Sequence, residues 1–331
     1  MLKDSFGRTL DYLRVSVTDR CNLRCVYCMP PEGVEWKPHN TVLSFEDFLR
    51  ICRIMAELGI RKIKVTGGEP LVRRGVASFI KNLTELPGIE KVTLTTNGLL
   101  LSAYLDEAEA MGALPAGINI SLDALNPEQS KQITRNDNTV PQAILPLLDR
   151  LLGKNITVKI NCVPIRNSNE EEILPITALA KDKNIAVRFI ELMPLGFAAA
   201  SKPVPGGEIA ALLEKTYGAL TPYSGVSGSG PAVYYKLPGF EGTIGFINAI
   251  SSGFCETCNR LRLTSGGFLK LCLSDDLGLD LKELLRAGAS DKEIAHAITE
   301  IAAKKPRYHN LSEVYCVRPS EHPDGMSGIG G

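Results

Sequence analysis

Residues 12–28 read YLRVSVTDRCNLRCVYC, an alternating segment that runs directly into three closely spaced cysteines. Leu13, Val15 and Val17 alternate with polar residues. Because successive side chains of a strand point to opposite sides, this alternation predicts a strand with one apolar and one polar face. The cysteines form a C-x3-C-x2-C triplet: Cys21, Cys25 and Cys28. The stretch therefore predicts a strand that ends in a thiolate site.

Three cysteines without a fourth are typical of an iron–sulfur cluster with one open iron. Such clusters are normally held by four thiolates, so a triplet leaves a position at which a small molecule could chelate the metal. Structural zinc is one alternative, but it prefers four closed ligands, and no histidine lies near the triplet. A disulfide is the other. It needs an oxidising compartment, whereas the N-terminal segment lacks the apolar core of a signal peptide and the nine cysteines are an odd number.

The composition bounds the class of protein. The 331 residues leave room for one barrel-type domain with an extension, or for two domains. Lys plus Arg equal Asp plus Glu at 37 each, so no global basic field is available for non-specific binding of nucleic acid. No apolar run approaches the roughly 18 residues of a membrane span. We expect a cytoplasmic protein with neither a nucleic-acid nor a membrane partner.

Alternation like that of the first strand recurs along the chain, with helical patterns between the segments. The six expected strands are residues 12–17, 62–66, 91–96, 117–122, 156–163 and 186–192. Strand and helix in series predict a parallel sheet. Buried parallel strands usually read as continuous apolar runs, so the alternation means that one face is polar.

If helices cover the apolar face, the polar face lines an open interior. We therefore predict an α/β fold, an incomplete (βα)6 TIM-like barrel whose lumen is not packed with bulky side chains. Arg14, Lys64, Lys159 and Arg188 would point inward and form a cavity for an anionic substrate. The alternative is that these cations lie on the exposed face of an open sheet.

The series of strand and helix patterns changes beyond about Pro203, where frequent Gly, Pro and Ser residues indicate loops. We expect two domains, residues 1–215 and 216–331, the second an α+β extension. Its expected elements are strands at 233–237 and 243–247 and helices at 281–286 and 291–304.

Two further motifs carry chemistry. Gly67 and Gly68, in Thr-Gly-Gly-Glu-Pro at the end of the second strand, would let the backbone approach a ligand. Downstream stands a second triplet, C-x2-C-x13-C, with two alternate arginines beside it: Cys255, Cys258 and Cys272, with Arg260 and Arg262. Paired guanidiniums suit phosphate recognition, although a small structural zinc site is an alternative for this triplet. Cys52 is expected in the core, and Cys162 and Cys316 receive no role.

The first triplet, with Tyr27 before its last cysteine, and the following Gly-Gly-Glu-Pro resemble the radical S-adenosylmethionine (SAM) superfamily. The downstream Cys-x2-Cys-Asn-Arg-Leu-Arg, Cys272 and the Gly-Gly tail resemble one family within it, the GTP 3′,8-cyclases that begin molybdenum-cofactor biosynthesis. The resemblance implies a radical SAM partial barrel whose mouth is closed by the C-terminal extension. It also implies a lyase in which a deoxyadenosyl radical removes the ribose 3′ hydrogen of GTP and the carbon radical attacks guanine C8.

The resemblance also implies ligands for particular residues. Two 4Fe-4S clusters would be bound, one by each triplet, and the first triplet and Arg262 would be catalytic. The implied SAM contacts are Tyr27, Gly68, Ser121 and Met193. The implied GTP contacts are Arg14, Lys64, Thr95, Lys159, Arg260 and Arg262. The terminal Gly330 and Gly331 would reach into the active site.

Partners are implied in the same way: an electron donor of the flavodoxin or ferredoxin type, a cyclic pyranopterin monophosphate synthase that takes up the product, and a second copy in a homodimer. Other classes of protein stay open from the residues alone. They are a radical SAM enzyme with an auxiliary cluster that acts on a peptide, a zinc-stabilised binding protein, and an iron–sulfur electron carrier.

Overall fold

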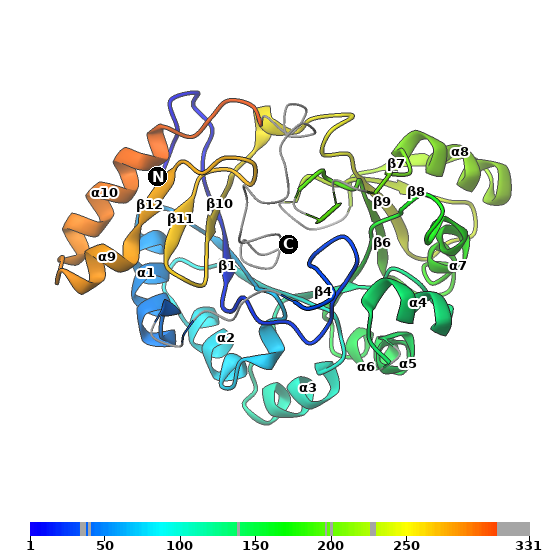
Figure 1. Cartoon of the computed structure of the whole chain (residues 1–331), viewed down its shortest axis with the longest axis horizontal. Coiled ribbons are helices and arrows are strands. Elements are labelled where there is room, and N and C mark those ends of the chain that lie inside the picture. Colours follow the sequence, from blue (N-terminus) through cyan, green and yellow to red (C-terminus); the bar gives the residue numbers. More distant parts are fainter. Residues whose placement is uncertain are drawn as a thin grey trace.

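The strands form one curved sheet around the centre of the molecule in the computed structural model of the chain (Figure 1). The structure describes residues 1–33, 38, 41–137, 140–195, 197–198, 201–225 and 230–309. The expected tail site at Gly330 and Gly331 and the thiol of Cys316 lie outside the described residues.

All six predicted strands are confirmed, and they lie side by side in chain order. Their bounds are β1 Tyr12–Ser16, β2 Lys62–Thr66, β3 Lys91–Thr96, β4 Gly117–Ser121, β5 Thr157–Cys162 and β6 Ala186–Ile190. Each neighbouring pair is parallel, as strand–helix units in series require. Several predicted segments run one or two residues past the observed strand, because there the chain leaves the sheet to enter the loops that line the cavity.

The C-terminal region extends the same sheet at both edges. β9, Thr243–Ile247, pairs in parallel with β6, and β10, Arg260–Leu263, pairs in parallel with β1. Antiparallel strands continue each edge: β8 Val233–Lys236 and β7 Thr221–Tyr223 beyond β9, and β11 Phe268–Lys270 and β12 Gly278–Asp280 beyond β10. β7 and β12 are the two edges of the sheet.

The expected boundary between residues 215 and 216 falls in the last turn of α8, Gly206–Tyr217. Strands from both sides of this point pair in the one sheet. The division into two domains stays a prediction.

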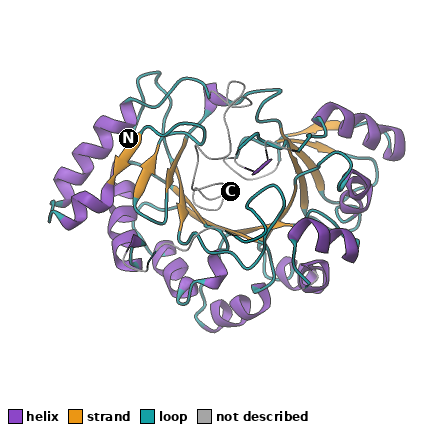
Figure 2. Cartoon of the chain, in the orientation of Figure 1, coloured by secondary structure: helices purple, strands orange, loops and turns teal. Residues whose placement is uncertain are grey.

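Helices surround the strands on the outer face of the sheet (Figure 2). Those that precede α8 in the chain are α1 Phe45–Leu58, α2 Val76–Thr84, α3 Leu101–Ala110, α4 Pro127–Thr134, α5 Val140–Ile144, α6 Leu148–Leu152 and α7 Ile173–Ala178. After α8 come α9 Leu281–Arg286 and α10 Asp291–Ala303. Among the described residues, no helix is long and apolar enough to cross a membrane.

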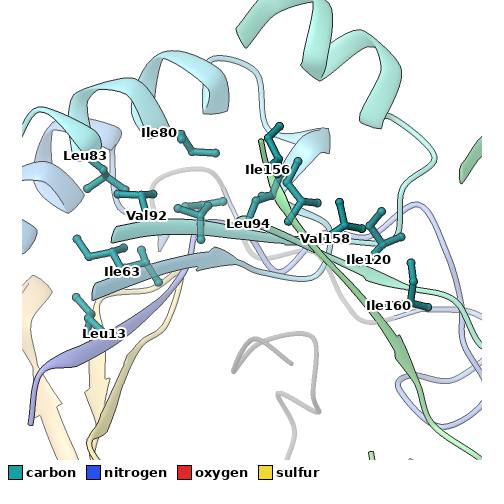
Figure 3. Close-up of a cluster of buried hydrophobic side chains, with 14 of the residues drawn as sticks. Leu13, Ile63, Ile80, Leu83, Val92, Leu94, Ile120, Ile156, Val158 and Ile160 are labelled. Atoms are coloured by element: carbon teal, nitrogen blue, oxygen red, sulfur yellow. The ribbon is translucent and has the colours of Figure 1, made fainter. Parts of the chain in front are cut away.

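The core lies between the sheet and these helices. Figure 3 shows Leu13, Ile63, Leu94 and Val158 of the strands below Ile80 of α2, and all five side chains are buried. Burying a side chain of this size contributes about 1.5–3 kcal/mol. The apolar face therefore points outward, as predicted, and leaves the polar face to the interior.

Local sequence fixes both ends of α1. The side chain of Ser44 accepts from the backbone N–H of Asp47, whose own carboxylate reaches back to Ser44 and completes a capping box at the start of α1. The helix ends at Gly59, whose φ of 112° is strained for other residues. Both ends of α1 can thus be recognised in the sequence.

Candidate active site

A cavity of about 320 Å³ lies on the inner face of the sheet, and residues of both cysteine triplets line it. The predicted site residues on its wall are Arg14, Cys21, Cys25, Tyr27, Cys28, Lys64, Gly68, Thr95, Ser121, Met193, Cys255, Cys258, Arg260, Arg262 and Cys272. Lys159 lines a smaller adjoining cavity of about 50 Å³, which shares Lys64 and Arg188 with the larger one. Segments more than 200 residues apart in the sequence thus meet around one space.

The loop of the first triplet is fixed by the end of α4. The backbone N–H groups of Arg24 and Val26 donate to the carbonyls of Thr134 and Ile133, both at 2.9 Å. Within the loop, the N–H of Cys28 donates to the carbonyl of Cys25 at 2.8 Å. This turn, together with the hydrogen bonds to the end of α4, places all three thiols on the cavity wall.

The two glycines after β2 allow close contact with the approach to this loop. A Cβ atom on Gly67 would lie 2.6 Å from the Thr18 carbonyl oxygen, and one on Gly68 would lie 2.4 Å from that of Arg20. The Gly68 N–H donates to the Thr18 carbonyl at 2.7 Å. The sequence predicted glycines that let the backbone approach a ligand. The structure adds that these glycines let the backbone after β2 approach the segment from Thr18 to Arg20 closely.

Glu69 and Asn97, which the sequence analysis did not select, connect this motif to the first thiol. The buried Glu69 carboxylate accepts from the Thr96 hydroxyl at 2.8 Å and from the Asn97 N–H at 2.6 Å. The Asn97 side-chain amide lies 3.9 Å from the Cys21 sulfur and donates to the Asn22 side chain at 2.7 Å. Burial raises the pKa of Glu69 to about 7. Glu69 lies three residues after β2, and Asn97 directly follows β3. This position at the end of a strand is the signal by which the sequence could have identified both residues.

Tyr27 is held by another residue that the sequence analysis passed over. Its hydroxyl donates to Asp123 Oδ2 at 2.7 Å, and Asp123 Oδ1 accepts from the Val163 N–H at 2.8 Å. Burial raises the pKa of Asp123 to about 6. Asp123 follows β4 by two residues, so the ends of β4 and β5 together fix the aromatic ring of the first triplet.

Two cysteines of the second triplet precede β10, and the third follows β11. Cys255 lies in a single 3₁₀ turn, Cys255–Thr257, and its carbonyl accepts from the N–H of Cys258 at 3.1 Å. Arg260 Nη2 donates to the Cys258 sulfur at 3.5 Å. Burial alone would raise the pKa of Cys258, but the charges of Arg260 and Lys305 lower it to about 7. A thiolate is therefore accessible here near neutral pH.

The donor chemistry of the two triplets fits iron–sulfur clusters. Each triplet presents three thiols to the cavity, and thiolates are the ligands of such clusters. Burial raises the pKa of Cys21 to about 11 and that of Cys28 to about 12, and a bound metal ion is what stabilises thiolates in such surroundings. In the part of the chain that the structure describes, no three His, Cys, Asp or Glu side chains are placed to hold a single metal ion.

A row of cations crosses the sheet beside the thiols. Arg14 is the register partner of Lys64 on β2 and of Arg262 on β10, so the three side chains share one face. Burial, with repulsion from neighbouring cations, lowers the pKa of Arg14 to about 10 and that of Lys64 well below its usual value. This density of positive charge is costly by itself and suits a highly charged anion.

Arg188 and Lys159 continue the cationic face on β6 and β5. Arg188 Nε donates to the side chain of Asn161 at 2.9 Å, and its Nη2 donates to that of Asn119 at 2.8 Å. Lys159 Nζ lies 3.4 Å from the Tyr234 hydroxyl. Burial, and then repulsion from Arg188 and Lys91, lower the pKa of Lys159 to about 7. The predicted inward orientation of the four cations is confirmed.

Two family models match most of the chain. The model described as the Radical SAM superfamily matches residues 15–180, and the model described as Molybdenum Cofactor Synthesis C matches residues 185–311.

Curated proteins named GTP 3′,8-cyclase are similar over almost the whole chain. The protein of Desulforamulus reducens is 44% identical over 315 residues, which are 94% of this chain and 95% of that protein. That of Pelotomaculum thermopropionicum is 43% identical over 335 residues and 100% of both chains. That of Syntrophomonas wolfei is 45% identical over 92% of this chain and 94% of its own.

Solved structures resemble the fold at low sequence identity. Streptococcus suis SuiB bound to S-adenosylmethionine has a TM-score of 0.62 at 15% identity, over 95% of this chain and 76% of that chain. SuiB bound to its precursor peptide SuiA has a TM-score of 0.56 at 16% identity, over 91% of this chain and 66% of that chain. At this identity the likeness shows the fold alone.

Proposed function

The chain belongs to the GTP 3′,8-cyclase family of the radical SAM superfamily, and from this premise we propose that it is a lyase that converts GTP to 3′,8-cyclo-7,8-dihydro-GTP, the first step of molybdenum-cofactor biosynthesis. One observation carries the proposal: both cysteine triplets face one cavity whose wall includes the cationic face of the sheet. Such a cavity can hold a sulfonium cosubstrate at one triplet and a triphosphate within reach of it.

Cys21, Cys25 and Cys28 of the first triplet would hold a 4Fe-4S cluster, which would supply an open iron for SAM. When bound, that cluster supplies the electron that splits SAM into methionine and a deoxyadenosyl radical. The residues assigned to SAM are Tyr27, Gly68, Ser121 and Met193, all on the cavity wall. Tyr27 is oriented by its hydrogen bond to Asp123 at 2.7 Å, so the ring is fixed before SAM arrives.

Cys255, Cys258 and Cys272 of the second triplet would hold a second 4Fe-4S cluster, which would supply a binding position for the guanine base. The residues assigned to GTP are Arg14, Lys64, Thr95, Lys159, Arg260 and Arg262. Arg262 is also assigned a catalytic role, because its partners across the sheet place it in the row of cations. The protein's task is to hold the ribose 3′ carbon near the radical and guanine C8 near that carbon, away from water.

The partners assigned through the family are an electron donor of the flavodoxin or ferredoxin type and a cyclic pyranopterin monophosphate synthase that receives the product. A homodimer and a cytoplasmic location complete the proposal. The charge balance of 37 cationic and 37 anionic side chains supports the absence of a nucleic-acid partner.

Anaerobic turnover tests the proposal. The full chain is reconstituted with iron and sulfide and incubated with SAM, reductant and GTP, and mass spectrometry follows deoxyadenosine and nucleotides. GTP-dependent formation of deoxyadenosine together with a cyclised nucleotide is expected. Deoxyadenosine without a nucleotide product would discard GTP as the substrate and favour a peptide-modifying enzyme. Metal analysis of the protein after anaerobic purification, before reconstitution, tests the remaining class. Zinc in place of iron and sulfide would favour a zinc-stabilised binding protein.

A further inference from the structure

The second cysteine triplet is held by two cations that the mechanism does not use. Arg8 lies in a hairpin near the N-terminus, and Lys305 follows α10 near the end of the described chain. We propose that Arg8 and Lys305 are positioning residues that set the three segments of the second triplet at the spacing its cluster needs. The inference rests on the proposed function, because it presumes the second cluster.

Contacts within the hairpin fix the orientation of the Arg8 side chain. Lys3 and Thr9 form an antiparallel bridge, and between them the Asp4 carboxylate accepts from the N–H groups of Phe6 at 2.9 Å and Arg8 at 3.0 Å. Asp4 also forms an ion pair with Arg8 Nε, in which the two side chains are 0% and 7% exposed. The guanidinium is therefore preorganised, with both terminal nitrogens directed away from Asp4.

Those two nitrogens donate to main-chain carbonyls of segments distant in sequence. Nη1 donates to Cys255 at 2.7 Å and to Arg307 at 3.0 Å, and Nη2 donates to Pro306 at 2.7 Å. Figure 1 shows the blue N-terminal segment beside the orange α10, which is the placement that these bonds require. Arg8 thus connects a residue of the triplet to the segment that carries Lys305.

Lys305 fixes the other two segments. Its side chain is almost completely buried, and Nζ donates to the carbonyls of Arg260, at 3.0 Å, and Leu271. Arg260 lies two residues after Cys258, and Leu271 directly precedes Cys272. Each cysteine of the triplet therefore lies within two residues of a carbonyl that Arg8 or Lys305 holds, or carries that carbonyl itself.

Cations suit this role for two reasons. A guanidinium can donate to several carbonyls in one plane and an ammonium can donate in three directions, so two side chains can hold the turn at Cys255 and the ends of the paired strands β10 and β11. Their positive charge also offsets the negative charge of a thiolate-bound cluster in the low dielectric of the cavity wall. A neutral donor would give the hydrogen bonds without the charge.

The test compares Lys305→Met with Lys304→Met in the full chain after anaerobic reconstitution. Lys304 is the adjacent exposed lysine, so it controls for loss of charge and for the change to Met. Two clusters contain about eight irons per chain. We expect about eight in Lys304→Met and about half as many in Lys305→Met, with the electron paramagnetic resonance signal of the SAM-binding cluster retained and the GTP-sensitive signal lost.

Arg8→Lys separates the fork of Arg8 from its charge. Lysine keeps the charge and the pairing with Asp4, but its single nitrogen cannot also occupy the positions from which Nη1 and Nη2 of Arg8 donate to Cys255 and Pro306, so we expect loss of the same GTP-sensitive signal at an unchanged melting temperature.

The outcomes separate this inference from the proposed function. If the wild type holds only about four irons, the second cluster and the inference fail together. If the wild type holds both clusters and Lys305→Met keeps both with unaltered spectra, the inference alone is wrong. Parallel loss of both clusters and of thermal stability in Lys305→Met would assign Lys305 to folding and would also overturn the inference.

Discussion

At the scale of residues, the cations of the cavity wall are the feature that most restricts the ligand. Arg14, Lys64 and Arg262 are register partners on adjacent strands. Like charges on adjacent strands repel one another and so oppose folding, and burial adds to this free-energy cost. Evolution usually tolerates such a cost where a ligand offsets it. A triphosphate offers several anionic oxygens to this row, and a neutral peptide does not.

Lys159 predicts a pH dependence of GTP binding. Its pKa is about 7 in the free protein, because burial and then the charges of Arg188 and Lys91 lower it. A nearby phosphate favours the ammonium and raises that pKa in the complex. Below pH 7 Lys159 is charged before GTP binds, whereas above pH 7 binding takes up a proton. The affinity should therefore fall as the pH rises above 7, by at most about tenfold per pH unit.

Calorimetric titration of the wild type and of Lys159→Met between pH 7 and 9 checks this prediction. The wild type should take up protons on binding, and the variant should take up fewer and show a flatter profile. Identical proton uptake in the two proteins would remove Lys159 from the GTP site.

Arg262→Ala predicts a selective loss of nucleotide binding. Hydrogen bonds of a charged group contribute about 1.5–3 kcal/mol each, so GTP affinity should fall by about ten- to a hundredfold. The first cluster should load normally, because Arg262 lies on β10, whereas Cys21, Cys25 and Cys28 lie in the loop that follows β1. Arg53→Ala, on an exposed ion pair with Asp291, serves as the control and should bind GTP like the wild type. Equal affinities in all three proteins would contradict the assignment of Arg262.

At the scale of elements, the ends of the parallel strands carry the first site. The end of β1 leads into the Cys21–Cys28 loop, the end of β2 carries Gly67 and Gly68, and the end of β3 carries Asn97. The backbone bond from Gly68 to Thr18, at 2.7 Å, joins the first two. The position of the loop therefore depends on the contact between these two strand ends as well as on its hydrogen bonds to α4.

Gly68→Ala tests that contact. Its Cβ would lie 2.4 Å from the Arg20 carbonyl oxygen, so the backbone must shift, at a cost of about 1–3 kcal/mol for such overpacking. We expect a lower midpoint of denaturant unfolding and loss of iron from the first triplet. Gly207→Ala is the matched control, because a Cβ there meets no atom within 4 Å and alanine favours the helix. Normal iron content in Gly68→Ala would show that the loop does not depend on this close approach.

How far the sequence predicts the molecule depends on how local each signal is. The alternation in β1 to β6 is local, and it correctly indicated both the strands and the inward face of Arg14, Lys64, Lys159 and Arg188. The triplets are short motifs and could be located at once. In contrast, the pairing of β10 with β1 and of β9 with β6 joins segments far apart, so it could not be predicted from periodicity. Asp123, Asn97, Arg8 and Lys305 are single polar residues whose roles follow only from their partners in space.

At the scale of the whole molecule, one sheet brings the two triplets together. β10 lies beside β1, so the second triplet begins next to the strand that leads into the first. The C-terminal region thereby contributes to the wall of the same cavity as the strands β1 to β6. A radical formed at the first triplet must therefore reach a nucleotide held at the second.

Turnover of GTP that carries deuterium at the ribose 3′ carbon tests this requirement most directly. The reconstituted full chain is incubated with SAM, reductant and the labelled GTP, and the deoxyadenosine is analysed by mass spectrometry. We expect deoxyadenosine that carries one deuterium, formed together with the cyclised nucleotide. Unlabelled deoxyadenosine, formed while GTP is bound, would show that the two triplets do not serve one reaction in one cavity.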